Sequence, residues 1–96
     1  MEIEIKDTTA YLNGRLDTAA SSAALKDLQP LFEKASETVV LDCSNLAYIS
    51  SSGLRIFLML RKEAAAKGGK VIVRGINNDI RNVFMMTGFI NLFNFE

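Results

Sequence analysis

A joint between a strand and a helix constrains the fold of this chain most. The run Val39-Val40-Leu41 is apolar and β-branched, as expected of a buried strand. Three consecutive serines follow at residues 50–52, and apolar residues then recur at helical spacing, at Leu54, Phe57, Leu58 and Ala65. We expect these four side chains to face a sheet. A buried strand that leads directly into a long amphipathic helix predicts an α/β architecture.

The rest of the chain continues this alternation of strands and helices. We expect strands over residues 2–6, 8–13, 38–43, 71–73 and 92–95, and helices near 19–33, over 51–67 and from about 78 to 87. Gly14 should break the second strand, and Pro30 should split the first helix in two. Gly68-Gly69 and Gly88 should end the later helices, with Asn77 or Asn78 capping the last one. Met85 and Met86 follow the apolar stripe of that helix and are expected to fill the core.

These elements define the expected fold class. It is a single α/β domain over residues 1–96, with a mixed, mostly parallel sheet built from right-handed β-α-β units. The alternating charged and apolar residues of Glu2–Lys6 predict an antiparallel pair with the next strand at the N-terminus. No linker, repeat or low-complexity tract interrupts the chain.

Composition excludes several functional classes. Eleven basic and eleven acidic residues cancel, and they form no basic block, so direct binding to nucleic acid is not expected. No apolar stretch approaches the ~20 residues of a membrane span, and the first residues lack the features of a signal peptide. We therefore expect a cytoplasmic protein.

The side chains needed for most catalysis are missing. The chain has no histidine, which removes Ser-His-Asp and Cys-His catalysis and most zinc sites. The single cysteine, Cys43, lies in an apolar strand and is expected to be buried and unreactive. The aspartates show no calcium-loop spacing. We expect neither an enzyme nor a bound metal or cofactor.

The three serines, Ser50-Ser51-Ser52, are the strongest candidate site. They open the expected helix at residue 51, where the first backbone N–H groups lack partners and the helix dipole is positive. Serine is a favoured cap at such a position, which explains one of them without any function. A phosphate added there would leave the fold intact.

Five short motifs occur along the chain in an order that is informative about its family. They are L-N-G-R-L-D at residues 12–17, the strand L-D-C-S at 41–44, S-S-S-G-L at 50–54, the Gly-Gly stop at 68–69, and a final helix closing on Thr87-Gly88. This arrangement resembles the STAS domain of anti-sigma factor antagonists, over about residues 11–95. In two positions the chain departs from the family pattern: Arg15 replaces a glutamate, and Ser50 replaces the acidic residue of the serine turn.

The resemblance implies roles for particular residues. Ser51 matches the phosphorylated serine, with Ser52 as the second choice, and Gly53 matches a glycine that allows close approach. The partner-binding surface would comprise Asp17, Ser50, Ser51, Ser52, Gly53 and Arg55, although Asp17 reads equally well as a helix cap. The implied partner is an anti-sigma factor of the serine-kinase type, which supplies ATP and magnesium, together with a serine phosphatase.

Two other functions stay open. The first is a STAS scaffold or transport-accessory module that binds through the same turn without phosphorylation, an interpretation that the Ser50 replacement favours. The second is a small anion or nucleotide binder, although no glycine-rich loop followed by lysine is present. Family members usually continue into another helix after the last strand, whereas this sequence stops at Glu96. We therefore expect a domain without that helix.

Overall fold

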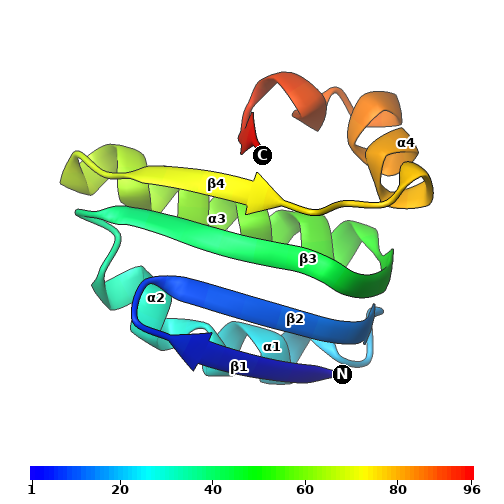
Figure 1. Ribbon diagram of the computed structural model, residues 1–96, viewed down its shortest axis with the longest axis horizontal. Coiled ribbons are helices and arrows are strands. Elements are labelled where there is room, and N and C mark those ends of the chain that lie inside the picture. Colours follow the sequence, from blue (N-terminus) through cyan, green and yellow to red (C-terminus); the bar gives the residue numbers. More distant parts are fainter.

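The computed structural model describes residues 1–96 and alternates strands with helices (Figure 1). The strands are β1 (Glu2–Lys6), β2 (Thr9–Leu16), β3 (Thr38–Ile49), β4 (Lys70–Arg74) and β5 (Asn94–Phe95). The helices are α1 (Ser21–Asp27), α2 (Gln29–Glu33), α3 (Ser51–Lys67) and α4 (Asn78–Met86), followed by the 3₁₀ turn η1 (Phe89–Asn91).

The five strands form one mixed sheet in the order β1-β2-β3-β4-β5. β1 and β2 are antiparallel, and the pairs β2–β3, β3–β4 and β4–β5 are parallel. The expected fold class and the antiparallel N-terminal pair are therefore confirmed. Because β2, β3 and β4 run in the same direction, their carboxyl ends meet at one edge of the sheet, on the right in Figure 1.

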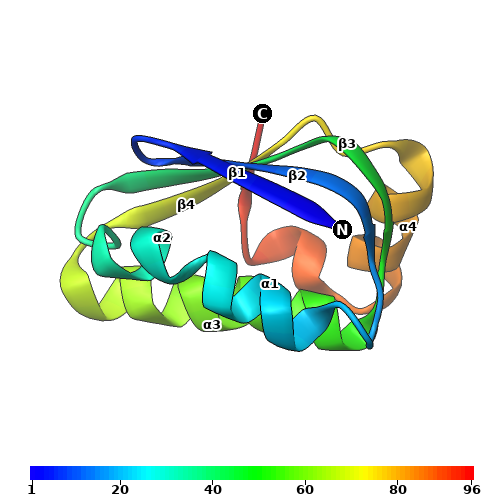
Figure 2. The same cartoon turned by 90° about the horizontal axis from the view of Figure 1, so that it is seen from below.

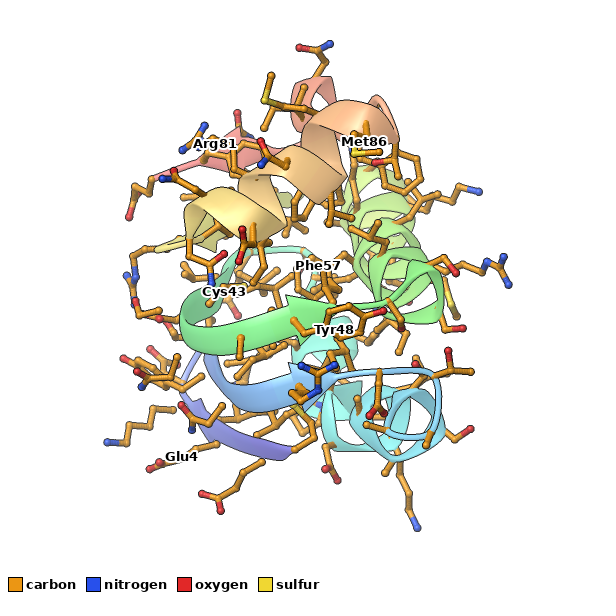
Figure 3. The ribbon with its side chains drawn as sticks, turned by 90° about the vertical axis from the view of Figure 1, so that its right-hand side faces the viewer. Glu4, Cys43, Tyr48, Phe57, Arg81 and Met86 are labelled. Atoms are coloured by element: carbon orange, nitrogen blue, oxygen red, sulfur yellow. The ribbon has the colours of Figure 1, made fainter.

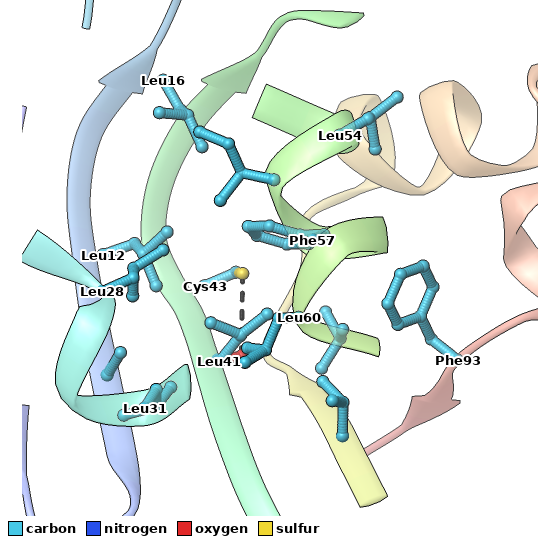
Figure 4. Packing of buried hydrophobic residues seen from close by; sticks show 14 of the residues in the cluster. Leu12, Leu16, Leu28, Leu31, Leu41, Cys43, Leu54, Phe57, Leu60 and Phe93 are labelled. Atoms are coloured by element: carbon cyan, nitrogen blue, oxygen red, sulfur yellow. Dashed lines mark hydrogen bonds between the residues drawn. The ribbon is translucent and has the colours of Figure 1, made fainter. Parts of the chain in front are cut away.

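The helices lie together on one face of the sheet, with α3 running along β3 and β4 (Figure 2). Between these layers lies one cluster of 22 buried residues. Its strand members alternate along the chain, as Ala10 and Leu12 in β2 or Val39, Leu41 and Cys43 in β3 do. Figure 4 shows Leu12, Leu41 and Cys43 of these strands facing Leu28, Leu31 and Phe57 of the helices.

Aromatic rings hold the C-terminal segment against this core. Phe84 of α4 meets Phe93 and Phe95 edge to face, with ring centroids 5.7 Å and 5.3 Å apart. Phe57 of α3 adds a further edge contact with Phe93 at 6.4 Å. Such pairs each contribute about 0.5–1.5 kcal/mol beyond their buried area. They attach the short strand β5 and the preceding Phe93 to α3 and α4.

Several expected boundaries are confirmed. The first helix breaks in two at Leu28, which leaves Pro30 in the first turn of α2. The helix α3 spans Ser51–Lys67 with Gly68 at a φ of 79°, and the side chain of Asn77 caps α4. Three strand predictions were wrong. β3 continues to Ile49 instead of ending at Cys43, because residues 45–49 still pair with β2. β2 continues through Gly14, because a φ of 106° and shifts in the pairing with β3 absorb the irregularity within the strand. The last strand is shorter than expected, since η1 precedes it.

The predicted orientation of some apolar residues was also wrong. On α3, Leu58 is only half-buried and Ala65 is exposed, while Ile56, Leu60 and Ala64 pack into the core. On α4, Met85 and Met86 are 58% and 87% exposed. The buried face of α4 is the narrow stripe of Ile80 and Phe84, and residues 85 and 86 follow at about 100° and 200° around the helix from Phe84.

Candidate functional site at the carboxyl edge of the parallel strands

The G-R-L-D segment and the serine turn meet at the carboxyl edge of the sheet. Leu16 pairs with Ile49 at the ends of β2 and β3, and the Ser50 N–H donates to the Leu16 carbonyl over 2.8 Å. Asp17 and Ser51 each follow one residue later. Two motifs more than thirty residues apart in sequence therefore lie side by side, as parallel pairing of their strands requires.

Ser50 and Ser51 differ in hydrogen bonding and exposure at the start of α3. The Ser50 side chain is 7% exposed, and its hydroxyl oxygen accepts from the Gly53 N–H over 3.1 Å, which makes it the helix cap. Ser51 is the first residue of the helix, and its exposed hydroxyl makes no hydrogen bond within the chain. Ser52 is half-buried. Capping thus accounts for Ser50 and leaves the Ser51 hydroxyl free.

Gly53 is required by packing inside the domain. A Cβ at this position would lie 2.8 Å from Leu16 Cγ and 2.9 Å from Ile49 Cγ1. The helix start therefore rests directly on the ends of β2 and β3. This close approach is internal, whereas the resemblance also implied room for a partner.

Asp17 caps the turn before α1 and not the helix itself, whose N-cap is Ala20 without a side-chain hydrogen bond. Its carboxylate accepts from the Ala20 N–H over 2.9 Å, and its own carbonyl accepts from the Ser21 hydroxyl over 2.9 Å. These bonds fix the turn that leads into α1. Asp17 remains half-buried beside the serine turn, so capping and a place at the edge of the site are compatible.

Arg15 and Tyr48 form a second exposed feature of this edge. They pair across β2 and β3, and the Arg15 guanidinium lies over the Tyr48 ring at 4.4 Å from its centroid. Tyr48 is 40% exposed, and Figure 3 shows it facing the viewer on the same side of the molecule as Met86. Sequence reasoning noted Arg15 only as a departure from the family pattern and did not identify Tyr48.

A hollow of about 170 Å³ lies beside the serine turn, between α3 and the segment that follows α4. It is lined by Ser51, Leu54, Arg55, Leu58, Thr87 and Phe89. The floor is apolar, and Arg55 is the only charged residue among the six. Sequence reasoning selected Ser51 and Arg55 but could not place Thr87 and Phe89 beside them.

The titratable groups with altered pKa values lie within the strands rather than in this hollow. Burial opposes ionisation of Asp42, but bonds from the Ser44 N–H at 3.0 Å and from Arg74 at 3.0 Å outweigh it and lower the pKa of this carboxyl. Burial raises the pKa of Cys43 to about 12, which removes the thiolate needed for reaction at neutral pH.

The structure contains no cluster of three or more histidine, cysteine, aspartate or glutamate side chains placed to hold a metal. None of its helices combines the length and the apolar character needed to cross a bilayer. The chemistry that this edge offers is therefore that of a free hydroxyl, a free guanidinium and a small apolar floor.

Comparison with known proteins gives consistent matches. The STAS domain family profile matches residues 1–96. BtrV of Bordetella bronchiseptica, named as a candidate anti-sigma factor antagonist, is 32% identical over 84 residues, which cover 88% of this chain and 72% of that protein.

Solved structures with lower sequence identity share the fold. A candidate anti-sigma factor antagonist from Thermotoga maritima superposes with a TM-score of 0.82 at 18% identity, covering 98% of this chain and 83% of that one. The Bacillus cell fate determinant SpoIIAA in its phosphorylated form gives 0.70 at 20% identity, covering 99% and 89%. With the profile spanning every residue and the sheet order described above, the chain belongs to the STAS domain family, among relatives named as anti-sigma factor antagonists.

Proposed function

We propose that this domain antagonises an anti-sigma factor of the serine-kinase type, and that phosphorylation of Ser51 by that partner ends the interaction. The observation that carries the proposal is that Ser50 and Ser51 have different roles at the start of α3. Ser50 caps α3, so the neighbouring Ser51 hydroxyl is exposed and free to be recognised or modified without loss of the cap.

The binding surface in this proposal is the carboxyl edge of the sheet. Its accessible members are Asp17, Ser51, Ser52 and Arg55, with Ser50 and Gly53 buried beneath them. To these we add Leu58, Thr87 and Phe89, which line the hollow. The domain acts by binding and catalyses no reaction. It works in the cytoplasm, where the anti-sigma factor would be displaced from a sigma factor.

The phosphoryl transfer belongs to the partner. The kinase moves the γ-phosphoryl group of magnesium-bound ATP to Ser51 Oγ. The phosphorus–oxygen bond to ADP breaks as the new ester bond forms, and the hydroxyl proton passes to a base of the kinase. A serine phosphatase restores the hydroxyl by hydrolysis. The related fold of SpoIIAA, a protein named as an anti-sigma factor antagonist, has been solved in unphosphorylated and phosphorylated forms, which supports this switch.

Phosphate weakens the complex through its charge. A phosphoserine carries about −1.5 to −2 charges at neutral pH, and these would enter an interface built around a neutral hydroxyl. A coupling of about 1–3 kcal/mol changes affinity by about 5- to 150-fold, which suffices for a regulator.

Binding of a kinase-fold anti-sigma factor to single-residue variants tests the proposal. We expect Ser51→Asp to weaken binding about tenfold, because the new carboxylate enters the interface. Ser51→Ala should largely retain binding, and Ser52→Ala is the matched control one residue away. Titration calorimetry measures the affinities, and unchanged melting temperatures show that the fold is intact. Parent-like binding by Ser51→Asp would reject the phosphorylation switch.

A STAS scaffold that binds through the same edge without phosphorylation is the second candidate. Ser50 favours it, because serine replaces the capping function of an acidic residue but not the negative charge that a kinase could recognise. Incubation with the kinase-fold protein and magnesium ATP, followed by mass spectrometry, separates the two functions. Binding without any phosphate on Ser51 would support the scaffold. A small anion or nucleotide binder would instead show saturable binding of ATP in the absence of protein partners.

A further inference from the structure

Ser51 and Arg55 share one face of α3. They are four residues apart and line the same hollow, with the serine nearer the start of the helix. Residues at this spacing are neighbours, about 5–6 Å apart at their Cβ atoms. An anionic residue followed by a cationic one four positions later is also the favourable orientation for an ion pair on a helix.

Arg55 has an unused guanidinium. It forms no ion pair, hydrogen bond or ring contact with the rest of the chain. By contrast, Arg15 stacks on Tyr48, Arg61 donates to the Leu92 carbonyl and Arg74 pairs with Asp42. The five N–H donors of Arg55 are thus available beside an exposed hydroxyl.

No other group in the hollow competes for either residue. The Thr87 hydroxyl, across the hollow, already donates to the Val83 carbonyl over 2.8 Å. The remaining lining residues are Leu54, Leu58 and Phe89, and the first turn of α3 contains no acidic residue. Within this hollow, a new anion on Ser51 would find one free cation and no carboxylate. The Asp17 carboxylate lies beside the serine turn but outside the hollow, where it accepts from the Ala20 N–H.

We propose that Arg55 is the internal receptor for a phosphate on Ser51, which it binds along the α3 side of the hollow. This inference rests on the proposed phosphorylation of Ser51 and adds a second effect to it. In the unmodified domain the Arg55 guanidinium is free to meet a carboxylate of the partner. In the phosphorylated domain the guanidinium binds the phosphate and covers the apolar floor. One modification therefore adds negative charge to the surface and also makes the Arg55 cation unavailable to the partner.

The test uses the full chain with phosphoserine incorporated at position 51 during translation, so that no partner is needed. Phosphorus NMR follows the second ionisation of the phosphate, whose ordinary pKa is about 6. Arg55 stabilises the dianion, so we expect Arg55→Gln to raise this pKa by about half a unit at low salt. Arg55→Lys should retain most of the effect, because it keeps the charge, and added salt should reduce it.

Arg81→Gln is the matched control, because Arg81 is an exposed arginine of α4 outside the hollow. It should change the pKa by less than about 0.1 unit. Equal phosphate pKa values in the parent and in Arg55→Gln would overturn the inference. That result would leave the proposed function standing, since loss of partner binding by Ser51→Asp is measured separately. Parent-like binding by Ser51→Asp would reject the switch whatever the phosphate pKa.

Discussion

The two adjacent glycines after α3 serve different purposes at the scale of single residues. Gly68 adopts a left-handed φ of 79°, and a Cβ there would meet only open space. Gly69 has no such backbone requirement, but its Cβ would lie 1.8 Å from the Ala35 carbonyl oxygen and 2.5 Å from that of Glu37. Gly68 turns the chain, and Gly69 allows it to pass against the segment before β3.

These different roles predict unequal costs of substitution. Gly68→Ala should lower the free energy of unfolding by about 1 kcal/mol, the cost of a left-handed alanine. Gly69→Ala should cost about 3 kcal/mol or more, because the two carbonyl oxygens belong to the packed turn before β3, where that of Glu37 already accepts from the Lys70 N–H. Urea denaturation of both variants measures the difference. Equal losses would mean that the two glycines share one conformational role.

At the scale of elements, α3 carries three distinct faces. Phe57, Leu60 and Ala64 pack on the sheet, and Met59, Lys62 and Glu63 border a hollow shared with residues of α1 and α2. The third face, with Ser51, Arg55 and Leu58, adjoins the segment after α4. The same helix therefore serves the core and presents the candidate site.

This arrangement distinguishes Leu60, which the helical spacing did not place on the sheet-facing stripe, from Leu58, which it did. Leu60→Ala should cost about 2–5 kcal/mol, because Leu60 is 0% exposed and its truncation leaves a cavity. The sequence predicts the same cost for Leu58→Ala, but the half-buried side chain should reduce that cost to about 1 kcal/mol. Chemical denaturation of the two variants checks the contrast. If Leu58→Ala lowered the free energy of unfolding by more than about 2 kcal/mol, Leu58 would belong to the core, as the sequence predicts.

Local signals account for what the sequence could predict about these elements. The Ser51–Lys67 helix has a serine cap and a glycine stop within a few residues of its ends, so its boundaries follow from chemistry nearby in the chain. Parallel pairing of β2 with β3 likewise brings Asp17 near the serine turn. Leu58 and Met86 were misplaced because burial depends on which distant segments cover a helix face. The hollow was not predictable for the same reason, since Thr87 and Phe89 reach α3 only through the packing of α4.

At the scale of the whole molecule, the helices share one face of a single sheet, and a continuous core of 22 residues lies between the two layers. Cys43 lies inside this core on β3, the middle strand of the five, and is 1% exposed. The neighbouring strands pair with β3 on both sides. No local fraying of a terminus or a loop can therefore uncover its sulfur atom.

Because this thiol is buried in the central strand, the rate at which it is labelled should report how often the protein unfolds. A disulfide reagent should modify Cys43 only in molecules that have unfolded, so labelling at neutral pH should be about 10³-fold slower than in the denatured chain, or slower still. Small amounts of urea should accelerate it with the same slope as equilibrium unfolding. A Cys43→Ala variant carrying Ala66→Cys on the exposed side of α3 is the control and should react immediately. Equally rapid labelling of Cys43 would reveal an opening of the central strand far more frequent than global unfolding.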